Sequence, residues 1–193
     1  MRVSGFWSWC HRHAEWVLTV RTFATDDAQA DLLDDIGRLL VAAFGDRFSA
    51  DDWEHTLGGR HVVVVEDGVL LAHAAVVERE IEVAGRSLRV GYVEGVAADP
   101  ARQLEGHGTL AMTEVTGVLV DGFEMGALST SRHTFYSRLG WVRWCGATFV
   151  RRDTERLRTV DEDDGIMVLR FGPSAHIDLT ADITCRARSG DDW

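Results

Sequence analysis

The sequence predicts an α/β (α+β) fold, in which helices alternate with a run of antiparallel strands. Residues 26–44 carry apolar side chains at helical spacing, whereas residues 61–98 hold three apolar segments rich in β-branched residues and separated by short turns. A glycine-rich turn at residues 103–108 then leads from the last of these strands into a second apolar run with helical spacing. We therefore expect a sheet with helices packed against it.

The N-terminal part begins with a predicted strand over residues 17–22, which the helix over residues 26–44 follows. The apolar stripe of this helix is expected to face the core and consists of Leu32, Leu33, Ile36, Leu39, Leu40 and Ala43. A second, short helix should begin after Ser49, because this N-cap residue precedes two acids that favour the positive end of a helix dipole. The glycines at positions 58 and 59 end that helix.

The middle of the chain is predicted to form a three-stranded meander. Residues 61–66 and 69–80 make a hairpin around the Asp67-Gly68 turn, which is a favoured two-residue hairpin turn. A further turn at residues 84–86 leads into a strand over residues 88–98. Three consecutive antiparallel strands therefore precede the glycine-rich turn.

The C-terminal half is predicted to contain two helices and four strands. The helices cover residues 109–120 and 132–139, the second ending at Gly140, and the strands cover residues 125–129, 142–151, 166–170 and 178–185. With only two prolines and no Ser/Gly-rich tract, residues 17–193 should form one domain. Residues 1–16 are expected to be an N-terminal extension or the product of an upstream start, with disorder as an open alternative.

Charge and composition restrict the function. A formal net charge of −11 disfavours binding to nucleic acid or to an anionic membrane, and favours a cationic ligand if the acids converge on one cleft; ordinary solubility is the alternative. All twenty basic residues are arginine, which excludes a lysine Schiff base. The three cysteines are far apart, and no apolar stretch is long enough to span a membrane, so a cytoplasmic protein is expected.

The histidines lack the spacing of metal ligands, so no metal site is expected. His55, His61 and His73 lie in or beside apolar segments and are interpreted as hydrogen-bonded structural residues. Residues 151–158 carry balanced charges and are a weak candidate for nucleic-acid binding.

A turn of the form Q-x-x-G-x-G is suited to bind phosphate. It consists of Gln103, Leu104, Glu105, Gly106, His107 and Gly108. The free amides of a first helical turn point outward at the positive end of the dipole, and they bind a pyrophosphate without any basic side chain. Glycine lets phosphate oxygens approach the main chain. The alternative is a strand-to-helix turn that needs glycine only for its own geometry.

Two motifs resemble the GCN5-related N-acetyltransferase (GNAT) superfamily. The Q-x-x-G-x-G turn follows the fourth strand, and a Y-x-x-x-G-W motif at residues 136–141 follows the fifth. The resemblance implies a central mixed, mostly antiparallel sheet flanked by helices, with acetyl-CoA as co-substrate. The turn would bind the pyrophosphate of acetyl-CoA, and the amides of Val96, Ala97 and Ala98 would bind its pantetheine arm and polarise the thioester carbonyl.

Further blocks resemble the aminoglycoside 2′-N-acetyltransferases, which acetylate the 2′-amine of these antibiotics and inactivate them. The blocks are residues 51–61, 91–97, 125–129, 162–165 and 188–193. Two of them, D-W-x-H-x-L-G-G-x-H and the terminal G-D-x-W, are specific, because the general acetyltransferase fold requires neither.

Glu94 and Tyr136 are the candidate catalytic residues. An amine is mostly protonated at neutral pH and needs a base, directly or through water, and Glu94 lies where by resemblance the sheet splays to admit both substrates. Binding the cationic substrate is its alternative role. Tyr136 matches the tyrosine that faces the thioester sulfur and would protonate the departing thiolate; the alternative is a packed tyrosine that only orients the thiol.

Carboxylates should bind the ammonium groups of the acceptor through charge-assisted hydrogen bonds. By resemblance, the substrate-binding residues include Asp163, Asp191, Trp193 with its free carboxylate, Ser129, and the backbone near Glu94 and Gly95.

The sequence departs from the family at Arg47, which stands where an aspartate is expected and would repel a polycation. Either Asp46 shifts into place, Asp52 compensates, or the substrate range differs. A second departure is the pair Leu104 and Glu105 in the phosphate turn, which leaves Arg102 as the only side-chain cation beside the pyrophosphate.

The predicted function is therefore transfer of an acetyl group to an aminoglycoside by direct attack in a ternary complex. Two alternatives remain: acetylation of another cationic amine, such as a cell-wall precursor, a polyamine or a protein N-terminus, and a non-catalytic acyl-CoA-binding module. The fold also implies a homodimer.

Overall fold

The computed structural model describes residues 17–193 and joins their strands into a single ten-stranded sheet. The strands are β1 (Leu18–Ala24), β2 (Arg60–Glu66), β3 (Val69–Val83), β4 (Arg86–Ala98), β5 (Met125–Ser129), β6 (Val142–Arg143), β7 (Thr148–Arg152), β8 (Glu155–Arg158), β9 (Ile166–Arg170) and β10 (Ile183–Arg186). The helices are α1 (Ala30–Phe44), α2 (Ala50–His55), α3 (His107–Gly122) and α4 (His133–Ser137). The N-terminal extension predicted for residues 1–16 lies outside the described residues.

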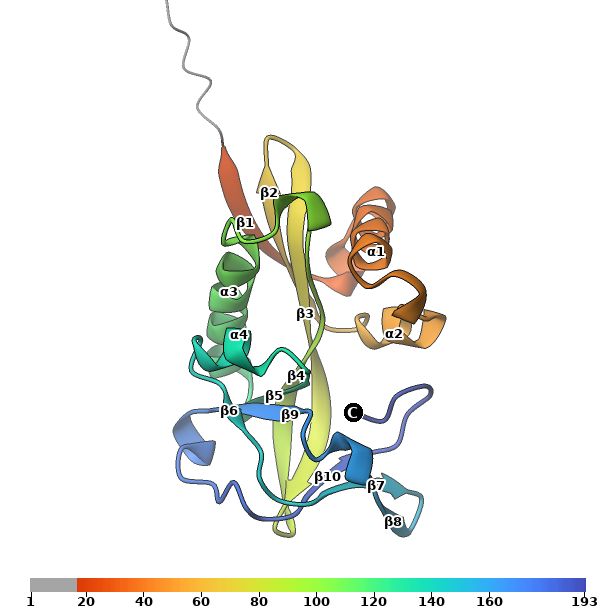
Figure 1. Cartoon of the computed structure of the whole chain (residues 1–193), viewed down its shortest axis with the longest axis vertical. Coiled ribbons are helices and arrows are strands. Elements are labelled where there is room, and N and C mark those ends of the chain that lie inside the picture. Colours follow the sequence, from red (N-terminus) through yellow and green to blue (C-terminus); the bar gives the residue numbers. More distant parts are fainter. Residues whose placement is uncertain (1–16) are drawn as a thin grey trace, which may run out of the picture.

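The sheet is mixed and mostly antiparallel, as predicted. Its strands follow the order β6-β9-β5-β4-β3-β10-β7-β8, and β2 pairs with both β3 and β1. Among the strands of residues 17–193, the β4–β5 and β10–β7 pairs are parallel and the others antiparallel. The long strand β3 pairs with β2 through residues 69–76 and with β10 through residues 81–83, which joins the upper and lower halves of the molecule in Figure 1.

Helices cover both faces of the sheet. In Figure 1, α3 and α4 lie on one side of β3 and β4, and α1 and α2 lie on the other. Helix α3 packs through Ala111, Met112, Val115 and Leu119, which are fully buried. Helix α1 packs through Ile36, Leu39 and Leu40 of the predicted stripe. Each fully buried Val, Leu, Ile or Met side chain stabilises the fold by about 1.5–3 kcal/mol.

Several predicted boundaries are wrong. Helix α1 begins at Ala30 rather than Asp26, because residues 25–27 form a separate 3-10 turn, and β10 begins at Ile183 rather than residue 178. The strand predicted over residues 142–151 is two strands: β6 pairs with β9, whereas β7 pairs with β10 and β8. Trp144 separates them, because its indole is buried and its N–H donates to the carbonyl of Ala181 (2.9 Å).

The sheet opens between β4 and β5. These two strands pair only from Val90 to Tyr92, opposite Met125 to Ala127. Residues 93–98 of β4 continue beyond this ladder with β3 as their paired neighbour, so one edge of β4 faces the space between the strands. The structure thus contains the splay that the resemblance implied.

The chain after β10, residues 187–193, is called here the C-terminal tail. It runs from the lower half of the sheet to α2 (Figure 1), where His55 Nε2 donates to the carbonyl of Ser189 (2.9 Å). A Cβ built on Gly190 would lie 2.6 Å from the Cβ of Asp51, so the tail lies directly against the helix. No helix among residues 17–193 is long and apolar enough to cross a membrane.

Candidate active site

Glu94 lies on β4 two residues beyond its ladder with β5. Its side chain is only 17% exposed, and its Oε1 accepts a hydrogen bond from Nη1 of Arg188 (2.7 Å), whose side chain is equally buried. Burial raises the pKa of Glu94 above its ordinary value, and the charges of Arg188 and Arg79 oppose this increase. A carboxylate with a raised pKa at the open edge of the sheet is suited to accept a proton.

Arg188 was not among the residues predicted from the sequence, although it begins the terminal block of residues 188–193. Its Nε donates to the carbonyl of Asp191 (2.7 Å), and its backbone N–H donates to Oδ1 of Asp192 (3.1 Å). The guanidinium groups of Arg188 and Arg79 lie over the ring of Tyr92, 5.6 and 4.9 Å from its centroid. Arg188 therefore connects the C-terminal tail to Glu94.

Tyr136 lies on α4 close to the glycine-rich turn. Its side chain is 7% exposed and packs edge-on against Phe135 and Trp141. Phe135 also reaches the turn, since a Cβ built on Gly108 would lie 3.7 Å from its Cζ. Burial raises the pKa of Tyr136 above its ordinary value, so the hydroxyl keeps its proton at neutral pH and is in the state that a proton donor needs.

The glycine-rich turn has the geometry expected of it. Gly106 is the N-cap of α3, with a left-handed φ of 92°, and no side chain caps the first turn of the helix. Leu104 is also left-handed (φ 69°), which is uncommon for a residue with a side chain. Gln103 and Glu105 are exposed, and His107 is buried as the first helical residue. The amides of this first turn are therefore open to a ligand.

Arg102, the only side-chain cation predicted beside the turn, already pairs with two carboxylates. Arg102 donates from Nε to Glu105 (2.6 Å) and from Nη2 to Glu66 of β2 (3.0 Å). These contacts raise the pKa of Arg102. A phosphate at this turn must therefore rely on backbone amides or draw Arg102 away from Glu105.

On the other side of the splay, the predicted acceptor residues separate into two groups. Ser129 ends β5, and its hydroxyl donates to Oε2 of Glu162 (3.4 Å), a carboxylate that the sequence did not single out. Burial, followed by the nearby charge of Asp191, raises the pKa of Glu162. Because Glu162 lies beside both Ser129 and Asp191, it belongs with them as a candidate for binding a cation.

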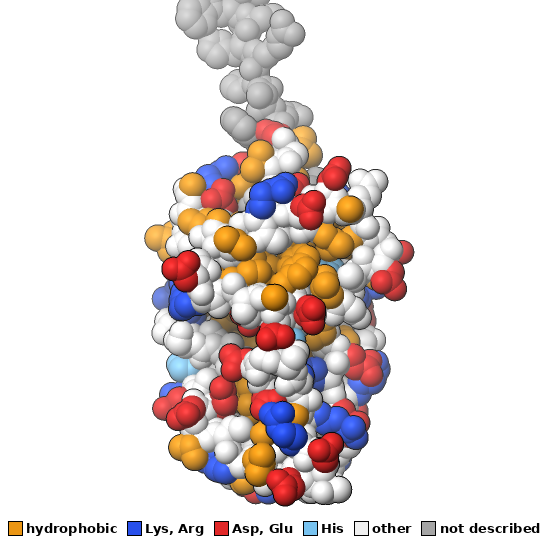
Figure 2. Space-filling model, turned by 90° about the vertical axis from the view of Figure 1, so that its right-hand side faces the viewer, with side chains coloured by type: hydrophobic (Ala, Val, Ile, Leu, Met, Phe, Trp, Pro, Cys, Tyr) orange, Lys and Arg blue, Asp and Glu red, His pale blue; other side chains and the backbone are white. Residues whose placement is uncertain are grey.

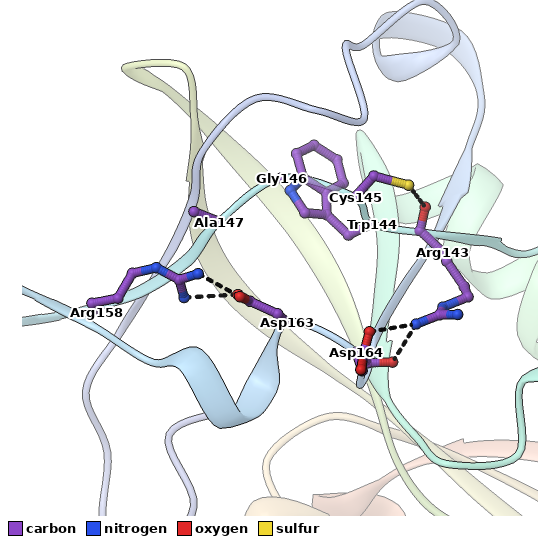
Figure 3. A pocket seen from close by; sticks show the side chains of 8 residues that line it. All are labelled: Arg143, Trp144, Cys145, Gly146, Ala147, Arg158, Asp163 and Asp164. Atoms are coloured by element: carbon purple, nitrogen blue, oxygen red, sulfur yellow. Dashed lines mark hydrogen bonds and ion pairs between the residues drawn. The ribbon is translucent and has the colours of Figure 1, made fainter.

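Asp163 belongs to the other group, and its partners are Thr148 and Arg158. Its carboxylate accepts hydrogen bonds from the backbone N–H (3.1 Å) and hydroxyl (2.9 Å) of Thr148, and it pairs with both terminal nitrogens of Arg158. The hydrogen bond from Arg158 is the main reason that its pKa is lowered to about 2. Asp163 also lines a cavity of about 440 Å³ (Figure 3). None of the other predicted site residues lines this cavity.

The remaining predicted acids lie between α1 and the C-terminal tail. Asp52 belongs to the capping box of α2, where its Oδ2 accepts from the backbone N–H and the hydroxyl of Ser49 (both 2.8 Å). Its negative charge also contributes to raising the pKa of Glu94. Asp46 is exposed in the short turn Gly45–Arg47. The indole of Trp193 is buried, and its N–H donates to the hydroxyl of Thr159 (3.2 Å).

The face that carries α1, α2 and the C-terminal tail is shown in Figure 2. Carboxylate side chains are spread over the middle of this face, below a band of hydrophobic side chains. Such a surface is suited to a cationic ligand. Among residues 17–193, no group of three His, Cys, Asp or Glu side chains is arranged to hold a metal ion.

Comparisons with known proteins agree with this geometry. The acetyltransferase (GNAT) domain family matches residues 24–143. The chain is 40% identical over 180 residues to an aminoglycoside 2′-N-acetyltransferase of Mycolicibacterium fortuitum, and the match covers 91% of this chain and 92% of that protein.

Solved structures share the fold. A GNAT family N-acetyltransferase of Escherichia coli in complex with CoA is similar with a TM-score of 0.66 at 16% identity, over 91% of this chain and 93% of that one. A GNAT family acetyltransferase of Brucella melitensis in complex with acetyl-CoA is similar with a TM-score of 0.58 at 20% identity, over 86% and 94% of the two chains.

Proposed function

Because the chain belongs to the GNAT acetyltransferase family, we propose that it transfers the acetyl group of acetyl-CoA to the 2′-amine of an aminoglycoside. The observation that carries the choice of acceptor is the 40% identity, over nearly the whole chain, to a protein with that activity. The buried carboxylate of Glu94 at the open edge of the sheet supports the chemistry.

The proposed reaction is a direct attack in a ternary complex. Glu94 removes one proton from the acceptor ammonium, directly or through one water molecule, and the neutral amine then forms a bond to the thioester carbonyl carbon. The amides of Val96, Ala97 and Ala98 lie on the strand that continues past Glu94, where they would bind the pantetheine arm and the carbonyl oxygen. The C–S bond then breaks, and Tyr136 donates its proton to the CoA thiolate and receives the second proton that the acceptor nitrogen loses.

Carboxylates on both sides of the splay would bind the other ammonium groups. We propose that Glu162 binds one of them beside Ser129, with Asp191 close by. Asp163 stays a candidate from the resemblance, yet a drug at this position would compete with Arg158 and Thr148 for its oxygens. Asp46 and Asp52 remain the alternatives that compensate for Arg47.

The test compares two aminoglycosides that differ only in an amine or a hydroxyl at the 2′ position. Mass spectrometry after incubation with acetyl-CoA should show a gain of one acetyl group on the first compound and none on the second. Acetylation of both would contradict the 2′ assignment. If neither is acetylated but a polyamine, a cell-wall precursor or a peptide is, the first alternative holds; binding of CoA without any acetylation supports the second.

Replacing Arg188 with Met should move the pH dependence of the reaction. Burial already raises the pKa of Glu94, and loss of the opposing guanidinium charge raises it further. A base acts only when deprotonated, so the acidic limb of the profile of kcat/KM against pH should shift to higher pH, with a larger loss of activity at pH 6 than at pH 9. The Arg188→Lys variant keeps a positive charge and should shift less. Superimposable profiles of wild type and Arg188→Met would contradict this account.

Replacing Glu105 with Gln should strengthen the binding of acetyl-CoA. The change removes a negative charge from the pyrophosphate turn and releases Arg102 from its 2.6 Å ion pair. Because an exposed ion pair is weak, we expect a modest effect, a fall in the KM for acetyl-CoA of up to about fivefold. Asp121→Asn at the far end of α3 removes the same charge away from the turn and should change KM little. Equal effects of the two variants would show that only the net charge matters.

A further inference from the structure

Two buried histidines lie beside Glu94 and take no part in the proposed reaction. His61 on β2 and His73 on β3 are both fully buried, and their ring centroids are 5.2 Å apart. Burial lowers the pKa of His61 to about 4 and that of His73 to about 3. Both rings are therefore neutral at physiological pH, and each has one nitrogen that donates and one that accepts.

The two rings form a hydrogen-bonded chain with a defined direction. His73 Nδ1 lies 2.8 Å from the carbonyl oxygen of Gly95, which only accepts, so Nδ1 must carry the proton. His73 Nε2 then accepts from Nδ1 of His61 (2.9 Å). The unprotonated Nε2 of His61 therefore accepts from the hydroxyl of Thr25 (2.9 Å), whose proton turns to it in preference to the more distant Gly59 carbonyl (3.3 Å). The Thr25 oxygen in turn accepts from the backbone N–H of Gly58 (3.0 Å). Every buried polar atom along this path has a partner.

The hydrogen-bonded chain ends at a bulge in β4 that directly follows Glu94. The ladder between β3 and β4 pairs Ala75 with Glu94 and resumes at His73 with Ala97, so two residues of β4 lie opposite a single residue of β3. Gly95 is the first of these two residues and has a left-handed φ of 56°.

The packing around Gly95 leaves the bulge little freedom. A Cβ built there would lie 2.7 Å from Cγ2 of the buried Thr56 and 3.4 Å from the ring of His73. The peptide after Glu94 is thus held between Thr56 and His73. On either side of this peptide lie the carboxylate proposed as the base and the amides proposed to bind acetyl-CoA.

We propose that His73 is a positioning residue for acetyl transfer, which holds the Gly95 carbonyl and thereby sets the direction of Glu94 and of the amides that follow. His61 and Thr25 keep the ring of His73 in the tautomer that donates to Gly95. This role rests on the proposed function, because it acts through the residues assigned to that reaction.

Two other roles for the pair fit the structure less well. The chain terminates on a carbonyl oxygen, which has no proton to release, so it does not carry protons to or from Glu94. Both histidines use both ring nitrogens in hydrogen bonds, and no third ligand joins them among the described residues, which argues against a metal site.

A matched pair of variants at position 73 tests the proposal. In His73→Asn, the side-chain amide can donate from nearly the position of Nδ1, whereas His73→Leu has a similar size and no donor. Both variants break the contact with His61, and His73→Leu should lose more thermal stability because it also leaves the Gly95 carbonyl unpaired, so kcat is compared at a temperature at which both variants are folded. We expect kcat to fall about tenfold or more in His73→Leu and to stay within about threefold of wild type in His73→Asn, because small misplacements of reacting groups are costly. Equal kcat values in the two folded variants would overturn the positioning role.

A second measurement separates this inference from the proposed function and does not depend on folding of the variants. Nitrogen-15 NMR of the wild-type protein, which has eight histidines, reports the tautomer of each ring. His61 and His73 should both carry their proton on Nδ1 at neutral pH. A proton on Nε2 of His73 would contradict the hydrogen-bonded chain, whatever the activity of the protein. If both tautomers are as expected but the protein acetylates no amine, the proposed function is wrong and the hydrogen-bonded chain stands.

Discussion

The Glu94→Gln variant should lose turnover by about 10²- to 10⁴-fold at neutral pH, which is the usual contribution of a general base. Gln has the same shape and can still accept the hydrogen bond from Arg188, so the site should stay folded. Without a base, the remaining rate depends on the small fraction of amine that is already deprotonated. The loss should therefore be greater at low pH than at high pH, as measured by kcat/KM from pH 6 to 9.

A second carboxylate serves as the control for this variant. Glu162→Gln removes a charge proposed to bind an ammonium group beside Ser129, so it should raise the KM for the aminoglycoside and leave kcat nearly unchanged. If Glu94→Gln shows that same pattern, its carboxylate binds the substrate and is not the base. A pH–rate profile of Glu94→Gln parallel to that of wild type would equally contradict the assignment.

The Tyr136→Phe variant should reduce kcat by about 10²-fold, because the CoA thiolate then leaves without a proton donor. The ring remains, so its packing against Phe135 and Trp141 and the affinity for CoA should be preserved. Isothermal titration of CoA, compared with kcat from steady-state rates, separates the two effects. Since burial raises the pKa of Tyr136, no loss of activity from its ionisation is expected in the neutral range.

The chain contains only one other tyrosine, which provides the matched control. Tyr92 is fully buried beneath Arg79 and Arg188, and Tyr92→Phe removes its hydroxyl without changing the ring. We expect this variant to keep kcat within a few-fold of wild type. A wild-type kcat in Tyr136→Phe would mean that the tyrosine only packs or orients the thiol.

Local sequence signals predicted most of the elements that build the site. The Asp67-Gly68 turn, the Ser49 N-cap and the left-handed Gly106 all appear where the pattern placed them, since each depends on the conformation of a few adjacent residues. The errors arose where a distant contact overrides local pattern. Burial of Trp144 divides an apolar run into β6 and β7, and β8 forms in a charged segment because β7 offers it an edge.

The same distinction applies to the candidate site. The acids of residues 161–164 are equivalent as a sequence, but the fold pairs Asp163 with Arg158 and turns Glu162 toward Ser129. The terminal block of residues 188–193 indicated substrate contacts and gave no sign that Arg188 would pair with Glu94. Nor did the isolated His61 and His73 indicate that they form one chain ending at Gly95.

By itself, the sequence predicted most of the elements in their order, the glycine-rich turn before α3, the family, and Glu94 and Tyr136 as candidate catalytic residues. These follow from spacing and from motifs of a few residues, which short-range sterics and hydrogen bonds control. Only the tertiary structure decided which carboxylates are free and which are paired, and how β4 is held at its bulge. Such contacts join residues that are far apart in the sequence, such as Glu94 and Arg188, 94 positions apart. They depend on the pairing of the whole sheet and on which polar groups become buried when it forms.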